Sequence, residues 1–188
     1  MKRSRNVALV LLGAAAFGVA GCVEEKTEAA AFDSKESCLA EASPGGWFTA
    51  ADCETAFAEA QLLHEETAPR YESRELCEQE HGVDACGDQA SSGGGGGFFM
   101  PMLMGYMIGQ ALGGGGRVMS QPVVRSAGGG FATPDGSTKI GGLNGGGQIK
   151  ASAFAKAPVT KGLAPMTKAQ VQSRGGFGGS AASRSVGG

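Results

Sequence analysis

The chain has 188 residues, 34 of them glycine, and a formal net charge of only −2. Of these glycines, 27 lie from residue 93 onward. Glycine loses the most backbone entropy on folding and has no side chain to bury, which excludes one large core built from the whole chain.

The N-terminus has the three parts of a bacterial lipoprotein signal. Cations in the first five residues precede a short apolar run and then Ala20-Gly21-Cys22. We expect residues 1–21 to be removed and a lipid, including palmitate, to be attached to Cys22. Residues 22–31 would form a tether. The alternatives are an ordinary secretory signal or a short membrane anchor, although the apolar run is too short to span a bilayer comfortably.

The charge changes sign along the mature chain. Residues 23–92 have a net charge of −13, from 17 acidic and 4 basic residues, whereas residues 93–188 have a net charge of +8, from 9 basic and 1 acidic residue. This asymmetry indicates either that the two halves attract one another or that each faces a different partner. Two solvated surfaces with no specific partner are the simpler interpretation.

Four cysteines remain after Cys22, an even number in a chain directed to an oxidising compartment, which predicts two disulfides. An internal repeat favours one pairing, because Ser-Lys-Glu-Ser-Cys before Cys38 resembles Ser-Arg-Glu-Leu-Cys before Cys77. If each repeat is one module, Cys38 pairs with Cys53 and Cys77 with Cys86. A metal site formed by Cys53, Cys77, His81 and Cys86 is the less favoured alternative, since no C-x-x-C motif accompanies it.

Capping residues divide the acidic region into three predicted helices: one from Asp33 or Ser34 to Ala42, one from Thr49 to about Thr67, and one from Ser73 to Gly82. Thr49 and Asp52 also have the spacing of a capping box. We therefore predict a small all-α, disulfide-stapled head domain over residues 32–88. Trp47, Phe48 and Phe57 would form its apolar centre.

Residues 98–112 form an apolar insert after a glycine linker, 89–97. Pro101 suits the first turn of a short helix, and Gly105 and Gly109 would then form a small-residue strip beside Tyr106. These four residues are the predicted contacts with the membrane or a partner. Three interpretations remain open: a helix in the membrane surface, a segment that packs back on the head, or a Cu(I) site that uses the methionines 100, 102, 104 and 107.

The remaining residues, 113–188, are basic and glycine-rich and show no sustained apolar periodicity. We expect a long, largely disordered, low-complexity tail. Its single Arg-Gly-Gly-Phe unit at Arg174 is weak evidence for nucleic acid, and anionic lipid headgroups or envelope polymers are the more plausible contacts.

Several of these motifs resemble the YgiB-like family of uncharacterised lipoproteins of Gram-negative bacteria. The matching segments are residues 20–22, 67–71, 74–77, 100–109, 174–178 and 183–188. The resemblance implies a cell-envelope setting and a functional link to an ATP-grasp ligase resembling glutathionylspermidine synthase. It supplies no catalytic residues and no cofactor.

These features together predict a non-enzymatic cell-envelope lipoprotein that faces the periplasm and mediates membrane-surface or protein–protein interactions. Val23 stands where an Asp would favour inner-membrane retention, so we expect the outer membrane. The alternative function is a periplasmic binder of a small cation, either a polyamine or copper.

Overall fold

The computed structural model describes residues 25–89, 97–111 and 117–174. Cys22 and the terminal segment 175–188 lie outside the described residues. The described elements, in chain order, are β1 (Lys26–Phe32), α1 (Lys35–Glu41), α2 (Ala50–Thr67), α3 (Arg74–His81), β2 (Cys86–Gln89), β3 (Phe98–Pro101), β4 (Gly105–Gln110), β5 (Val118–Arg125), β6 (Phe131–Ala132), β7 (Lys139–Ile140), β8 (Gly145–Lys150), the 3-10 helix η1 (Ala151–Phe154) and α4 (Lys168–Ser173).

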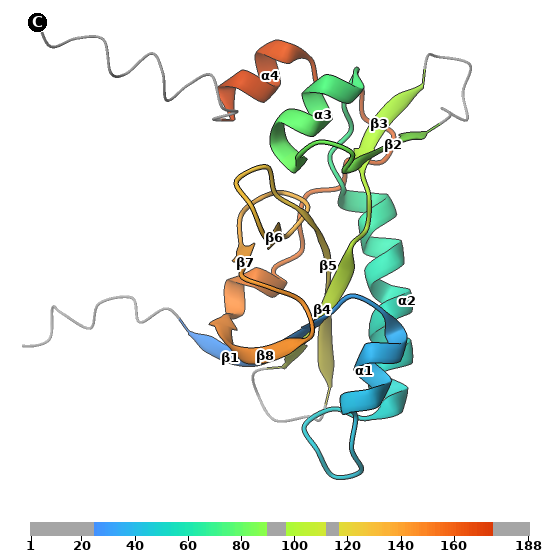
Figure 1. The fold of residues 1–188 in the computed structure, drawn as a ribbon, viewed down its shortest axis with the longest axis vertical. Coiled ribbons are helices and arrows are strands. Elements are labelled where there is room, and N and C mark those ends of the chain that lie inside the picture. Colours follow the sequence, from blue (N-terminus) through green and yellow to red (C-terminus); the bar gives the residue numbers. More distant parts are fainter. Residues whose placement is uncertain (1–24, 90–96, 112–116, 175–188) are drawn as a thin grey trace, which may run out of the picture.

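Six strands form one curled antiparallel sheet in the order β7-β6-β5-β4-β1-β8. Helices α1 and α2 lie along one side of this sheet. Helices α3 and α4 and the β2–β3 pair form the upper end of the molecule in Figure 1, and α1 lies near the lower end. The prediction of an all-α fold is therefore wrong. Strands from the predicted tether, insert and tail share one sheet, so the predicted boundaries do not separate structural units in the described residues.

The predicted helices of the acidic region are confirmed. Ser34 caps α1, and the side chains and backbones of Thr49 and Asp52 form a capping box at the start of α2. Ser73 caps α3, which ends at Gly82 with a φ of 96°. These ends were predictable because capping depends on neighbouring residues alone.

The apolar insert is extended rather than helical, which corrects the second element of the predicted fold. Residues 98–101 form β3, and residues 105–110 form β4 in the middle of the sheet. Gly105 and Gly109 allow other parts of the chain to pack closely against β4. A β-carbon at Gly105 would collide with the Phe32 carbonyl, and one at Gly109 with the Phe154 ring. The glycine spacing therefore serves close packing within the sheet.

The glycine-rich region is also ordered over residues 117–174, which corrects the expectation of a disordered tail. It supplies β5 to β8, η1 and α4. Its strands gain their hydrogen-bond partners from residues far away in sequence, such as β1, which pairs with β8 over Lys26 to Ala31. The predicted tether is part of this sheet as well, because β1 begins at Lys26.

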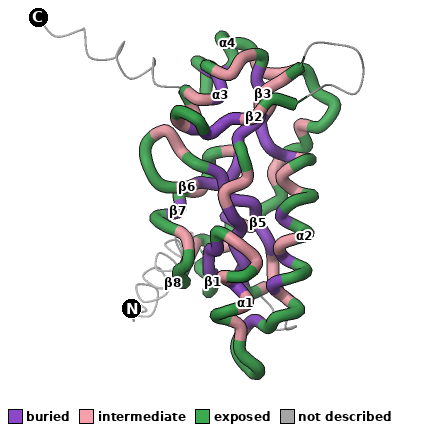
Figure 2. Tube along the Cα trace, turned by 45° about the vertical axis from the view of Figure 1, so that its right-hand side comes forward, coloured by how far each residue is buried: buried purple, intermediate pink, exposed green. Residues whose placement is uncertain are grey.

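Three apolar clusters hold the fold together, and most of their members lie on the central strands and the inner face of α2 (Figure 2). The first packs α1 and α2 against Phe32, Tyr106 and Ile108. Of the predicted apolar centre, Phe48 is buried in this cluster, and Trp47 and Phe57 pack against it partly exposed. The second cluster covers the other face of the sheet, and the third holds α3 to α4.

The predicted disulfide pairing is confirmed by the structure. Cys38 and Cys53 join α1 to α2 with a Cα–Cα distance of 5.9 Å, and Cys77 and Cys86 join α3 to β2 with a distance of 6.2 Å. Both distances are ordinary for a disulfide. Within the described residues, none of the helices is long and apolar enough to cross a membrane.

Candidate functional site

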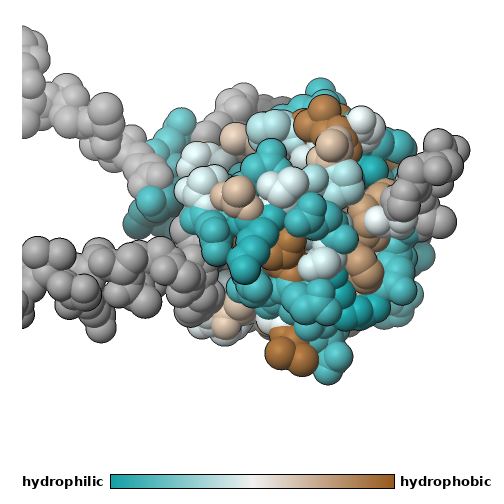
Figure 3. Space-filling model, turned by 90° about the horizontal axis from the view of Figure 1, so that it is seen from above, coloured by the Kyte–Doolittle hydropathy of each residue, from teal (hydrophilic) through white to brown (hydrophobic). Residues whose placement is uncertain are grey.

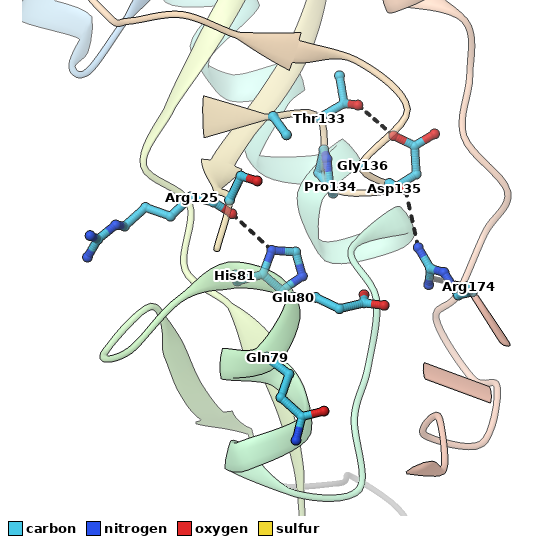
Figure 4. Close-up of a pocket in the computed structure, with 11 residues that line it drawn as sticks. Gln79, Glu80, His81, Arg125, Thr133, Pro134, Asp135, Gly136 and Arg174 are labelled. Atoms are coloured by element: carbon cyan, nitrogen blue, oxygen red, sulfur yellow. Dashed lines mark hydrogen bonds between the residues drawn. The ribbon is translucent and has the colours of Figure 1, made fainter. Parts of the chain in front are cut away.

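A polar pocket of about 220 Å³ lies between the C-terminal end of α3, the end of β5 and the turn from β6 to β7 (Figure 4). Arg174, which follows α4, closes one side. The polar lining residues come from four separate elements and include Gln79, Glu80, His81, Ser126, Thr133, Asp135 and Arg174. The pocket therefore depends on the complete fold rather than on one motif.

Tyr71 holds two of the lining residues, Glu80 and His81, through a buried hydrogen-bond network. Its hydroxyl lies 2.6 Å from Glu80 Oε2 and 2.8 Å from His81 Nε2. Tyr71 is fully buried, and His81 is 5% exposed. Burial, with the Glu80 carboxylate beside it, raises the pKa of Tyr71 well above its ordinary value, so the phenol keeps its proton at neutral pH.

His81 uses both of its ring nitrogens inside the protein. Nδ1 lies 3.0 Å from the Arg125 carbonyl, which can only accept, so Nδ1 carries a proton and donates it. Burial lowers the pKa of His81, which leaves Nε2 unprotonated at neutral pH and facing the Tyr71 hydroxyl. The phenolic proton is thus shared between Nε2 and the Glu80 carboxylate.

Asp135 organises the opposite wall. One of its carboxylate oxygens accepts hydrogen bonds from the Thr133 hydroxyl at 2.6 Å and from the Ser137 hydroxyl at 3.0 Å. Partial burial opposes ionisation, but these hydrogen bonds outweigh it and lower the pKa of Asp135. Arg174 Nη2 donates to the Asp135 carbonyl at 3.2 Å, which holds the guanidinium beside this wall of the pocket (Figure 4).

Several polar side chains at the pocket are engaged inside the protein. His81 contacts the Arg125 carbonyl and the Tyr71 hydroxyl, and the Thr133 hydroxyl donates to Asp135. The charged residues of the lining are Glu80, Asp135, Arg125 and Arg174, so the pocket offers both acceptors and donors to a ligand.

No group of three or more metal-ligating His, Cys, Asp or Glu side chains occurs in the part of the chain that the structure describes. The four methionines considered for copper are divided among β3, β4 and the segment between them. Met107 packs in the core beside Val123, and Met102 is exposed. His64 lies in the last turn of α2, and its Nε2 is 2.9 Å from the Pro101 carbonyl.

The four residues predicted to contact a membrane or partner lie in the interior instead. Tyr106 is fully buried, and Pro101, Gly105 and Gly109 are buried on β3 and β4. Among the three interpretations of the insert, the structure agrees with the one in which the segment packs back on the head. The segment packs there because the aromatic and apolar side chains of β4 complete a hydrophobic core that α1 and α2 alone are too small to form.

The sequence analysis did not bring the pocket residues together, because they are separated by up to 95 positions and share no motif spacing. It considered His81 only as a metal ligand and Arg174 only as part of an Arg-Gly-Gly-Phe unit. One signal was available: Asp135 is the single acidic residue after residue 93, in a Thr-Pro-Asp-Gly-Ser turn. The adjacent Glu80 and His81 gave no indication that a buried tyrosine would join them.

Comparison with known protein families gives a match that extends over nearly the whole described fold. A family model described as "Protein of unknown function (DUF1190)" matches residues 26–188, which include every described element. The chain belongs to the DUF1190 family. The resemblance to uncharacterised YgiB-like proteins is consistent with this DUF1190 membership.

Two curated relatives of this DUF1190 chain are UPF0441 proteins from two strains of Klebsiella pneumoniae, MGH 78578 and 342. Each is 34% identical over 123 residues, which cover 60% of this chain and 53% of the relative. The chain thus spans about half the length of the curated relatives it matches. No solved structure matches it.

Proposed function

We propose that this DUF1190 protein is a cell-envelope lipoprotein, anchored at Cys22, that acts by binding a partner rather than by catalysis. The observation that carries this proposal is the pairing of all four remaining cysteines as two disulfides within the fold. Stable disulfides are typical of oxidising compartments, where a lipoprotein signal would deliver the chain.

The position of β1 supports a role close to a membrane. Only four peptide steps separate Cys22 from Lys26, where β1 begins, and they span at most about 14 Å. A lipid on Cys22 would therefore hold the sheet near the bilayer surface. The outer membrane is the proposed location, because Val23 lacks the carboxylate that favours inner-membrane retention.

The polar pocket supports partner binding away from that surface. Strand β5 begins at Val118, beside the end of β4, and ends at Arg125, whose carbonyl lies at the pocket. Because a strand of eight residues spans about 26 Å, the pocket lies about that far along the sheet from the start of β5. In addition, the α3–α4 end of the molecule is mostly hydrophilic, with hydrophobic residues in separate groups (Figure 3). We propose that an unidentified envelope protein presents a polar side chain to this pocket. The functional link to an ATP-grasp ligase, which the resemblance implies, is a separate proposal.

A second candidate is binding of a polyamine through the carboxylates of Glu80 and Asp135, which line the pocket together with Arg125 and Arg174. Calorimetric titration with spermidine tests it. Saturable one-to-one binding that is lost in Glu80→Gln and retained in Glu59→Gln, an exposed change on α2, would favour this candidate. No saturable binding would eliminate it.

The anchor is tested by labelling cells that produce the protein with an alkyne fatty acid and separating the membranes. We expect the label on the wild-type protein in the outer-membrane fraction and its loss in Cys22→Ser. An unlabelled wild-type protein in the soluble fraction would contradict the proposal.

A further inference from the structure

We propose that two copies of the chain associate edge to edge through β8, so that their sheets continue into one another. Strand β8 is the last strand of the sheet and, among the described residues, pairs with β1 on one side and with no strand on the other. Five of its six residues are exposed, and Ile149 is half-buried. An open strand edge of this kind is a template for pairing with another strand.

The backbone of β8 presents hydrogen-bonding groups at this edge. The Ala151 N–H donates to the Glu25 carbonyl at 2.8 Å and continues the register that pairs Lys150 with Lys26. Hydrogen-bonding directions alternate along an antiparallel strand, so Gly147 and Ile149 also face β1. Gly146 and Gln148 therefore direct their N–H and C=O groups outward, toward an added strand.

The sequence of β8, Gly-Gly-Gly-Gln-Ile-Lys, is complementary to itself in one antiparallel register. A two-fold axis through Gly147 places Gly146 opposite the partner's Gln148 and Gly145 opposite the partner's Ile149. Gln148 and Ile149 then each face a glycine, and the outward-facing residues Gly146 and Gln148 form hydrogen-bonded pairs. A different occupant would not need this match between the two halves of the strand.

Charge does not oppose this register. The two Lys150 side chains lie at opposite ends of the paired strands, so these like charges do not face one another.

A six-residue edge is a small interface, so association in solution should be weak. Confinement to a membrane raises the effective concentration and strengthens it. Only this strengthening rests on the proposed lipid anchor. The pairing itself is independent of the anchor and is tested without it.

The test uses the mature chain with Cys22→Ser, so that the added cysteine is the only thiol outside the two disulfides. In the proposed register, Gly147 faces the partner's Gly147 in a non-hydrogen-bonded pair, with Cα atoms about 4.5 Å apart, which a disulfide can bridge. Gly147→Cys is compared with Gly142→Cys under mild oxidation. Neither position has a neighbour within 4 Å of an added β-carbon, and both are exposed.

We expect Gly147→Cys to give a covalent dimer on a non-reducing gel and Gly142→Cys to give far less. Adding Gln148→Pro, which removes an outward N–H, should abolish the crosslink, whereas Gln148→Ala should retain it. Thermal unfolding verifies that each variant is folded. Equal crosslinking at both positions, or no crosslink from a folded Gly147→Cys variant, would overturn the proposal whatever the state of Cys22 in cells.

Discussion

Gly109 of β4 lies directly beneath the ring of Phe154, and a β-carbon at position 109 would overlap that ring. The contact joins the centre of the sheet to η1, which follows β8. Gly109→Ala should therefore displace the ring and lower the free energy of unfolding by about 1–3 kcal/mol. Urea denaturation measures this loss.

Gly147→Ala on β8 is the matched control, because an added β-carbon there meets no atom within 4 Å. It should leave stability nearly unchanged. Equal effects of the two substitutions would show that the loss at position 109 comes from backbone propensity rather than from the Phe154 contact.

The two disulfides should contribute unequally to stability. The Cys38–Cys53 bond closes 15 residues and the Cys77–Cys86 bond closes 9. Restriction of the unfolded chain predicts about 3 kcal/mol for the longer loop and about 2.6 kcal/mol for the shorter one. Denaturation of the double Cys→Ser variant of each pair measures these losses. A larger loss from the Cys77–Cys86 pair would contradict this order.

Acidification should destabilise the fold through two histidines, His81, which is buried, and His64, which is half-buried. Burial lowers the pKa of His64 and of His81, despite the favourable Glu80 carboxylate beside His81. Below about pH 6.5 the unfolded chain therefore binds more protons than the folded chain. As the pH decreases through this range, the free energy of unfolding decreases as well. Above neutral pH both states hold neutral histidines, and the effect vanishes.

Urea denaturation at about pH 7.5 and about pH 5.5 tests this sign. His81→Gln should be less stable than the wild type at the higher pH but should lose less stability between the two. An undiminished loss in His81→Gln would assign the pH dependence to other groups, such as His64.

The Tyr106 hydroxyl is buried and finds no hydrogen-bond partner among the described residues. Burial raises the pKa of this phenol to about 12. Tyr106→Phe removes the unsatisfied group and keeps the ring contacts with Phe32 and Phe57, so stability should stay equal or rise by about 1 kcal/mol. A loss of more than about 1 kcal/mol would indicate a partner for this hydroxyl.

The helices and disulfides could be predicted from sequence because their signals are local. Ser34, Thr49 and Ser73 each cap the residues that directly follow them, and the repeat around Cys38 and Cys77 marks each bridge as one module. Residues close together in the sequence were therefore sufficient to predict these helices and disulfides.

The strands could not be predicted in the same way, because their pairing is non-local. β1 contains Ala29, Ala30 and Ala31, a residue type depleted in strands, and becomes a central strand only when β4 and β8 lie on either side of it. The pocket is equally non-local, since Glu80 of α3 and Asp135 of the β6–β7 turn line one pocket although they are far apart in the sequence.

The central claim, a disulfide-stapled lipoprotein of the envelope, is tested most directly by mass spectrometry of the native protein under non-reducing conditions. We expect a mature chain that begins at an acylated Cys22, with proteolytic peptides that link Cys38 to Cys53 and Cys77 to Cys86. A chain that retains residues 1–21, with an unmodified Cys22 and free thiols at the other four positions, would contradict it.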